Sequence, residues 1–201
     1  MKNYLCLNGN KIELTPEQVK SLTGEMKESG YDVSLDESRE IARVGKYEFI
    51  VLKRTESYVW LLLKGSLGDM RFGETNDFRT SDIKRRSEEF AGELASIIGA
   101  ASIVEHTVDL TSDDGLKDYG STTARVSLLT ADMYREHVYM IDKYKLDDWW
   151  WLATPFSTPT HGYEKPVKCV APSGCIINYY YGDYFCGVRP FCILKSDIFV
   201  S

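Results

Sequence analysis

Residues 47–63 read YEFIVLKRTESYVWLLL, and this stretch decides the fold. Its two halves, 47–53 and 58–63, are rich in aromatic and aliphatic residues, and the four polar residues between them are typical of a turn. The pattern predicts two consecutive strands. The second half is apolar enough for a central strand of a sheet, so we expect this pair to begin the core.

The chain that follows predicts one long helix and further strands. Ser81 is a favourable N-cap for a helix, and Gly99 is a favourable residue to end it. The apolar residues between them recur at helical spacing. That apolar face consists of Phe90, Leu94, Ile97 and Ile98. Residues 103–110 and 125–129 have the pattern of strands, and Thr130 opens a second, shorter helix. After Trp149, short strands alternate with loops rich in Pro, Thr, Ser and Gly.

The N-terminal segment has a different pattern. Residues 4–7 and 12–14 flank an Asn8-Gly9 turn, which predicts a short hairpin. Thr15-Pro16 then predicts the start of a helix that Gly30 ends. The acidic stretch at 36–40 indicates the boundary between this segment and the rest of the chain. We therefore expect an N-terminal hairpin-helix appendage over 1–38 and the main domain over 39–201.

Composition narrows the classes of partner and location. The 201 residues include 24 basic and 30 acidic side chains, and the net charge of −6 disfavours nucleic acid. No apolar run approaches the roughly 18 residues of a membrane span, and the N-terminus lacks the features of a signal peptide. We expect no membrane association and a cytoplasmic protein, or a virion-associated one if it is phage-encoded.

No set of residues predicts an enzyme. The five cysteines form no Cys-x-x-Cys pair, the sequence has neither a phosphate-binding loop nor a nucleophile elbow, and it has only three histidines. Asp113-Asp114 is a pair of adjacent residues, which favours a turn over a shared metal. The sequence thus predicts no catalytic residue, no metal and no cofactor.

Several separated motifs resemble one family. They are FIVL at 49–52, SDIK at 81–84, VSLLT at 126–130, WWWLATP at 149–155, APSG at 171–174 and GVRP at 187–190. Together they resemble an uncharacterised family of bacterial and phage proteins with a C-type-lectin-like C-terminal domain, the fold also used by formylglycine-generating enzymes. The resemblance covers roughly residues 41–195. Members of that family usually carry an Arg directly after the Trp-Leu pair, where this chain has Ala153. Any role of that arginine in the family therefore cannot be assigned to this chain.

The resemblance implies an α+β fold: a C-type-lectin-like mixed domain with a small twisted antiparallel sheet, two or three helices and long loops. Within it, Gly187 allows close backbone approach, Arg189 can tie loops together, and Pro190 fixes the entry into a last strand at 191–194. We therefore assign structural roles to Trp149, Trp150, Gly187, Arg189 and Pro190.

The residues before Gly187 predict a binding surface. Tyr gives large, rigid contact area, and Asn, Ser and Gly add adaptable polar contacts. If this segment is instead a plain hairpin, alternation still leaves either Tyr179 and Tyr181 or Tyr180 and Tyr184 facing outward. We interpret Cys175 and Cys186, which flank this segment, as residues that pack in the core. The predicted binding residues are Trp151, Phe156, His161, Tyr163, Asn178, Tyr179, Tyr180, Tyr181, Asp183 and Tyr184.

We therefore expect a non-enzymatic recognition module, phage- or prophage-encoded, that binds a protein, glycan or small-molecule ligand and can form a homo-oligomer. Lectin-like phage proteins include targets of diversity-generating retroelements, whose mutated surfaces have a similar composition. Two alternatives stay open. One is an oxidative or transfer enzyme of the formylglycine-generating type that uses Cys169, Cys175 and Cys186. The other is a phage inhibitor of a host defence factor.

Overall fold

The computed structural model describes residues 3–7, 10–15, 33–36, 38 and 40–199. Contacts divide the chain into two units, Met1–Asp32 and Val33–Ser201. In the first unit, β1 (Asn3–Leu7) and β2 (Asn10–Leu14) form the expected antiparallel hairpin. The turn at Asn8-Gly9 and the helix expected after Thr15 lie outside the described residues.

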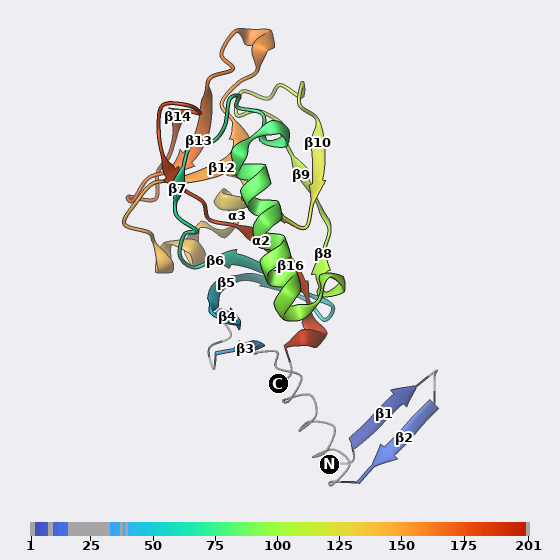
Figure 1. Cartoon of the computed structure of the whole chain (residues 1–201). Coiled ribbons are helices and arrows are strands. Elements are labelled where there is room, and N and C mark those ends of the chain that lie inside the picture. Colours follow the sequence, from blue (N-terminus) through green and yellow to red (C-terminus); the bar gives the residue numbers. More distant parts are fainter. Residues whose placement is uncertain (1–2, 8–9, 16–32, 37, 39, 200–201) are drawn as a thin grey trace. The chain divides into compact units, whose positions relative to one another are not determined.

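The second unit is a mixed α+β domain in which strands predominate (Figure 1). It begins at Val33 because β3 pairs with β4, so the division falls six residues before the boundary expected at 38. The described residues contain two α-helices, α2 (Asp82–Ile98) and α3 (Ala131–Ile141). The fold class α+β is therefore confirmed at this level.

The larger sheet is antiparallel, has seven strands and follows the order β11-β16-β6-β5-β4-β3, with β8 also paired to β16. The strands predicted at 47–53 and 58–63 are its centre, β5 and β6. The strand expected at 103–110 is divided between this sheet and a separate β9-β10 hairpin. The strands of the seven-stranded sheet are β3 (Val33–Leu35), β4 (Ile41–Val44), β5 (Tyr47–Arg54), β6 (Tyr58–Leu63), β8 (Ile103–Val104), β11 (Val126–Ser127) and β16 (Phe191–Lys195).

The second sheet has five strands in the order β14-β13-β12-β15-β7, with one parallel pair, β12 and β15. With two sheets of this size, the domain is richer in strands than the small sheet that was expected. The members are β7 (Asp69–Met70), β12 (Trp150–Pro155), β13 (Pro166–Val170), β14 (Ile176–Tyr180) and β15 (Cys186–Gly187). The hairpin beside it consists of β9 (His106–Asp109) and β10 (Ser121–Ala124).

Helix α2 covers the seven-stranded sheet (Figure 1). Ser81 is its N-cap, with Oγ accepting from the Lys84 N–H at 3.0 Å, and Gly99 follows its last residue. Phe90, Leu94 and Ile98 are buried against the sheet, as their spacing predicts, whereas Ile97 is half-buried. This contact forms the first layer of the core.

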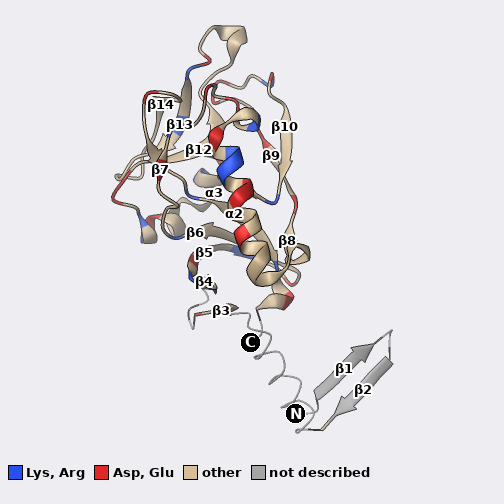
Figure 2. Ribbon diagram, viewed as in Figure 1, with Lys and Arg blue, Asp and Glu red and all other residues tan. Residues whose placement is uncertain are grey.

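Charged residues of both signs alternate along the outer side of α2 (Figure 2). The basic run Lys84-Arg85-Arg86 is matched one or two turns later by acidic residues. Lys84 pairs with Glu88, Arg85 with Glu89 at 2.8 Å, and Arg86 with Glu93 at 3.0 Å. The run is therefore a paired helix face rather than a separate basic patch.

Strand β12 is covered on both faces. Successive residues of β12 alternate between two clusters: Trp150 packs with α3, and Trp151 packs on the opposite face with Phe72 at 5.6 Å between ring centres. The indole N–H of Trp151 donates to the Met70 carbonyl at 2.9 Å. Trp151 is 0% exposed, so the prediction that it belongs to a surface is wrong. A strand that is buried on both faces leaves no side chain for a partner.

The GVRP segment closes the core as expected. Gly187 lies against Ser66 and Trp149, because a Cβ there would stand 2.9 Å from Ser66 Oγ and 3.2 Å from the Trp149 carbonyl oxygen. Val188 is buried, and Pro190 precedes β16. Among the described residues, none of the helices is long and apolar enough to cross a membrane.

Candidate functional site

A polar cavity of about 220 Å³ opens beside the first turn of α3. Thr154 on β12 lines it, as do the end of β9 and the turn that follows it. The lining residues are Asp109, Thr111, Ser112, Asp113, Thr130, Ala131, Asp132, Arg135 and Thr154. Three carboxylates and an arginine therefore face a space that hydroxyl groups also line.

Two buried threonines connect the cavity to the start of α3. Thr130 is the N-cap, and its Oγ1 accepts from the Met133 N–H at 3.2 Å. Thr154 Oγ1 accepts from the Ala131 N–H at 2.9 Å. Each hydroxyl thus satisfies a helix N–H that has no partner within the helix, and keeps its own proton for a further hydrogen bond.

A buried lysine fixes the turn at one side of the cavity. Lys168 lies in the apolar strand β13, its side chain is 8% exposed, and its Nζ donates to Asp113 Oδ2 at 3.0 Å. The other oxygen of Asp113 accepts from Arg135 Nη2 at 3.1 Å, and Arg135 Nη1 donates to Asp132 at 2.6 Å. Partial burial acts to raise the pKa of Asp113, but the bonds from Lys168 and Arg135 outweigh it, and the pKa is lowered.

The neighbouring carboxylate holds the loop after β12. Asp114 Oδ2 accepts from Ser157 Oγ at 2.5 Å and lies 2.9 Å from His161 Nδ1, while Oδ1 accepts from Ser112 Oγ at 2.5 Å. Burial acts to raise the pKa of Asp114, but the three hydrogen bonds outweigh it and hold the pKa well below its ordinary value. Asp113 and Asp114 therefore have separate partners, in agreement with their interpretation as a turn.

Half of the predicted binding residues lie on the cavity's side of the five-stranded sheet. Lys168 is directly opposite Asn178 on β14, and alternation puts Tyr180 on the same face. The Lys168 ammonium is also 5.6 Å from the centre of the Phe156 ring, which contacts Tyr163 at 6.2 Å. With His161, these residues form an aromatic and polar rim, which we name the α3-side rim: Phe156, His161, Tyr163, Asn178 and Tyr180.

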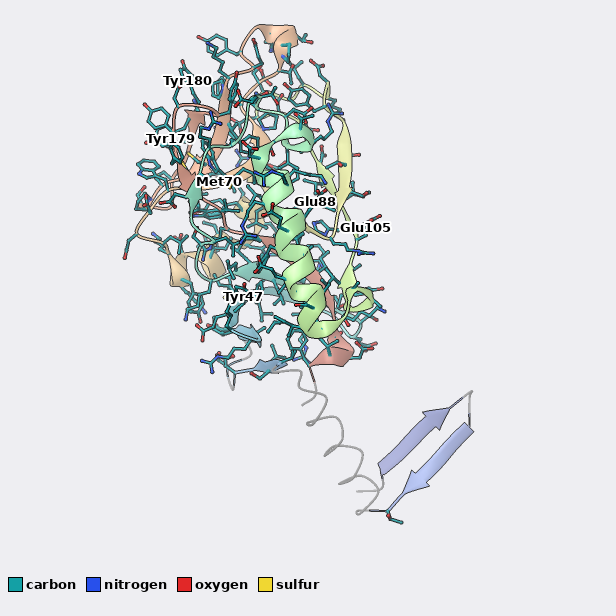
Figure 3. The ribbon with its side chains drawn as sticks, viewed as in Figure 1. Tyr47, Met70, Glu88, Glu105, Tyr179 and Tyr180 are labelled. Carbon is teal, nitrogen blue, oxygen red and sulfur yellow. The ribbon has the colours of Figure 1, made fainter. Side chains whose placement is uncertain are left out.

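The other tyrosines lie on the opposite face. Tyr179 stacks on Tyr184 at 4.3 Å between ring centres, and Trp149 contacts Tyr179 at 5.0 Å. Figure 3 labels Tyr179 and Tyr180 at the outer edge of the sheet. Tyr180 and Tyr184 are about half exposed, whereas Tyr179 and Tyr181 pack partly against the core. Of the two arrangements that the sequence left open, the structure therefore has Tyr180 and Tyr184 outward.

The remaining predicted residues are placed as follows. Asp183 is exposed in the turn after β14. Phe185, which is not among the predicted binding residues, is 66% exposed beside Tyr184. Arg189 is fully buried and binds backbone carbonyls, which is the arrangement that a structural role requires.

The cysteines differ from one another in exposure. Cys169 and Cys186 are buried together, and the hydrogen bond to Cys169, followed by burial, raises the pKa of Cys186. Burial also raises the pKa of Cys192 to about 12. Cys175 is exposed, so its interpretation as a packing residue is wrong, whereas that of Cys186 is confirmed. Cys175 lies in the turn before β14.

One residue in the sequence is a local sign of the cavity. Lys168 interrupts the otherwise apolar strand Pro166–Val170, and a lysine in a buried strand requires an acidic partner. That partner proves to be Asp113, 55 residues away along the chain. Among the described residues, no group of three or more His, Cys, Asp or Glu side chains is arranged to hold a metal.

Comparison of the chain with models of known protein families, with curated proteins and with solved structures finds no significant match.

Proposed function

We propose that this protein is a non-enzymatic recognition module that binds one ring of a hydroxyl-rich ligand, such as a sugar residue, in the cavity beside α3. The observation that carries the proposal is the cavity of about 220 Å³ with converging polar groups. Pockets for drug-sized ligands span roughly 300–1,000 Å³, so this one fits a single small ring.

The lining groups match the hydrogen bonding of a polyol. A sugar hydroxyl both donates and accepts, and here Asp109, Asp113 and Asp132 accept while Arg135 and the threonine hydroxyls donate. Arg135 and Lys168 offset the charge of Asp113 and Asp132, so the cavity does not select strongly for a cation. A neutral ligand with several hydroxyl groups satisfies both kinds of partner.

The α3-side rim adds an apolar contact. Phe156 lies next to Lys168, and Tyr163 contacts Phe156. Aromatic rings beside a polar pocket can cover the apolar face of a sugar ring. The resemblance of residues 149–155 and 187–190 to a phage and bacterial family supports the finer parts of this proposal. These are a C-type-lectin-like fold and a phage or prophage origin.

Saturation-transfer NMR with a panel of neutral monosaccharides tests the proposal. At least one sugar should receive magnetisation from the wild-type protein, and Thr154→Val, which keeps the side-chain shape but removes the cavity hydroxyl, should weaken its binding at least tenfold. Tyr163→Ala should also weaken binding of that sugar. Tyr139→Ala is the matched control, because Tyr139 is 89% exposed on α3 and outside the cavity lining. Failure of every sugar to bind, or equal binding by Thr154→Val, would contradict the proposal.

A second candidate is protein recognition through the opposite face. Tyr184 and Phe185 are adjacent exposed aromatic residues, supported by the stack with Tyr179 and Trp149. Rigid exposed aromatics are typical anchors of protein interfaces. A partner captured from host extracts by the wild type but not by Tyr184→Ala/Phe185→Ser, with Thr154→Val unaffected, would support this function and assign it to this face.

A further inference from the structure

Strand β14 is the edge of the five-stranded sheet, and its sequence is uncharged. Between Lys168 and Asp183 the chain has no charged residue. Among the described residues, β14 pairs only with β13. Natural proteins commonly protect an exposed edge with Lys, Pro or a bulge, and β14 has none of these.

The register with β13 shows which backbone groups face outward. Tyr181 N–H donates to the Lys165 carbonyl and Ala171 N–H donates to the Cys175 carbonyl, so the odd-numbered residues of this segment bond to β13. The N–H and C=O groups of Ile176 and Asn178, and the N–H of Tyr180, therefore point away from the sheet. The Tyr180 carbonyl accepts from Asp183 N–H at 3.4 Å.

We propose that β14 pairs antiparallel with β14 of a second copy of this chain, about a two-fold axis at Asn178. An outward row of N–H and C=O groups is complementary to an extended strand. The row is self-complementary about Asn178, because a two-fold axis there places Ile176 opposite Tyr180 of the other copy. Each such pair is an aliphatic–aromatic cross-strand contact, a favourable kind, and the two Asn178 amides can bond to each other.

The lack of charge at this edge allows a copy of this chain to pair there. Each copy has a net charge of −6, so two copies repel each other on average. The uncharged segment 169–182 removes that repulsion at the contact itself. On the face that carries Tyr179, the pairing also brings Ile177 opposite Tyr179 of the other copy, so the apolar layer of one sheet continues into the next.

Sedimentation velocity over a wide range of concentrations tests the dimer with the full chain. The wild type should convert from monomer to dimer as its concentration rises. Asn178→Pro removes an outward N–H but no hydrogen bond to β13, and should raise the dissociation constant at least tenfold. Asn178→Ser, which keeps that N–H, should still form the dimer.

Asn178→Glu is the second variant, in case proline disturbs the strand. Within one chain the new carboxylate lies opposite Lys168 and is tolerated. Across the two-fold axis it faces the same new carboxylate of the other copy, and the two negative charges repel. It should weaken the dimer at low salt and less at high salt. Circular dichroism of each variant checks that the domain remains folded.

The exposed Cys175 provides a measure of the register. A spin label on Cys175 in a Cys6→Ser background should report a separation of about 20 Å between copies, since six residues at about 3.4 Å each separate the two sites. A protein that is monomeric at all concentrations would overturn the proposal, as would a dimer unaffected by both Asn178→Pro and Asn178→Glu or a dimer with a clearly different separation. Thr154→Val should not affect dimer formation, so the sugar proposal and this one fail independently.

Discussion

The guanidinium of Arg189 lies 5.0 Å from the centre of the Trp150 ring, and both side chains are buried. Arg189 Nε donates to the Leu63 carbonyl at 2.8 Å, and Nη2 donates to the carbonyls of Lys64 and Tyr144 at 3.0 and 2.9 Å. One side chain thus connects the end of β6 with the segment after α3, beside the strand that carries Trp150. Burial lowers the pKa of Arg189 to about 10, which leaves it charged at neutral pH.

Replacement of Arg189 should be among the most destabilising single changes. Arg189→Met leaves the carbonyl groups of Leu63, Lys64 and Tyr144 without this donor, at a cost of roughly 1–3 kcal/mol each where no water replaces it. Chemical denaturation should show a loss of at least about 3 kcal/mol in the free energy of unfolding. Arg189→Lys should not restore it, because an ammonium lacks the planar fork. Arg125→Lys, at an exposed position, is the control. Wild-type stability in Arg189→Lys would contradict this role.

Two glycine substitutions should have opposite effects on stability. Gly187→Ala places a methyl group 2.9 Å from Ser66 Oγ and 3.2 Å from the Trp149 carbonyl oxygen, and should cost about 1–3 kcal/mol. Gly92 lies on the exposed side of α2 with open space around it, so Gly92→Ala should stabilise by about 0.5–1 kcal/mol. Thermal and urea denaturation measure both. Adding Ser66→Ala to Gly187→Ala should recover part of the loss, and no recovery would show that the backbone contact dominates.

The cysteines should separate by reactivity. Cys175 is exposed, whereas Cys169, Cys186 and Cys192 are buried, and the pKa values of Cys186 and Cys192 are raised. Because the thiolate is the reactive form, Cys175 should react with iodoacetamide much faster than these three under native conditions. Peptide mass spectrometry at timed intervals measures this. Rapid modification of Cys169 or Cys186 in the folded protein would instead support the alternative enzyme function that depends on those thiols.

Asp114 should make stability depend on acidity. Its folded-state pKa is lowered below the ordinary 3.8, so the stability it contributes is present above that pH and is lost as the pH falls through the folded value. Asp114→Asn should therefore give a shallower fall of the unfolding free energy below about pH 4. Ser157→Ala removes one of the donors to Asp114. It should also make the fall of the unfolding free energy with pH shallower, but by less than Asp114→Asn does. Identical slopes in Asp114→Asn and wild type would exclude this role.

The regular elements could be predicted because their signals are local. β5, β6 and α2 each combine a hydrophobic period with a turn or cap residue inside one short stretch, and the structure has them at nearly the predicted bounds. The GVRP segment was also interpretable, because Gly187, Arg189 and Pro190 each have a distinct backbone or hydrogen-bonding property.

The candidate cavity could not be predicted because its parts are distant in sequence. Asp113, Arg135, Thr154 and Lys168 come from four separate segments, and no local pattern states that they meet. The same applies to Trp151, whose aromatic neighbours suggested a surface. Only the packing of Phe72 and its neighbours in the tertiary structure covers the Trp151 side chain.

The sequence by itself determined the central strands β5 and β6 and the helix α2, and it indicated that a hairpin in the tyrosine segment would present alternate rings to opposite sides. Only the tertiary structure decided which rings face outward and which charged groups pair. The physical reason is that hydrophobic periodicity acts within one element, whereas strand register and sheet order fix which elements become neighbours. Tyr180 is exposed on one face and Tyr179 stacked on the other because β14 pairs with β13 in this register at the edge of the sheet.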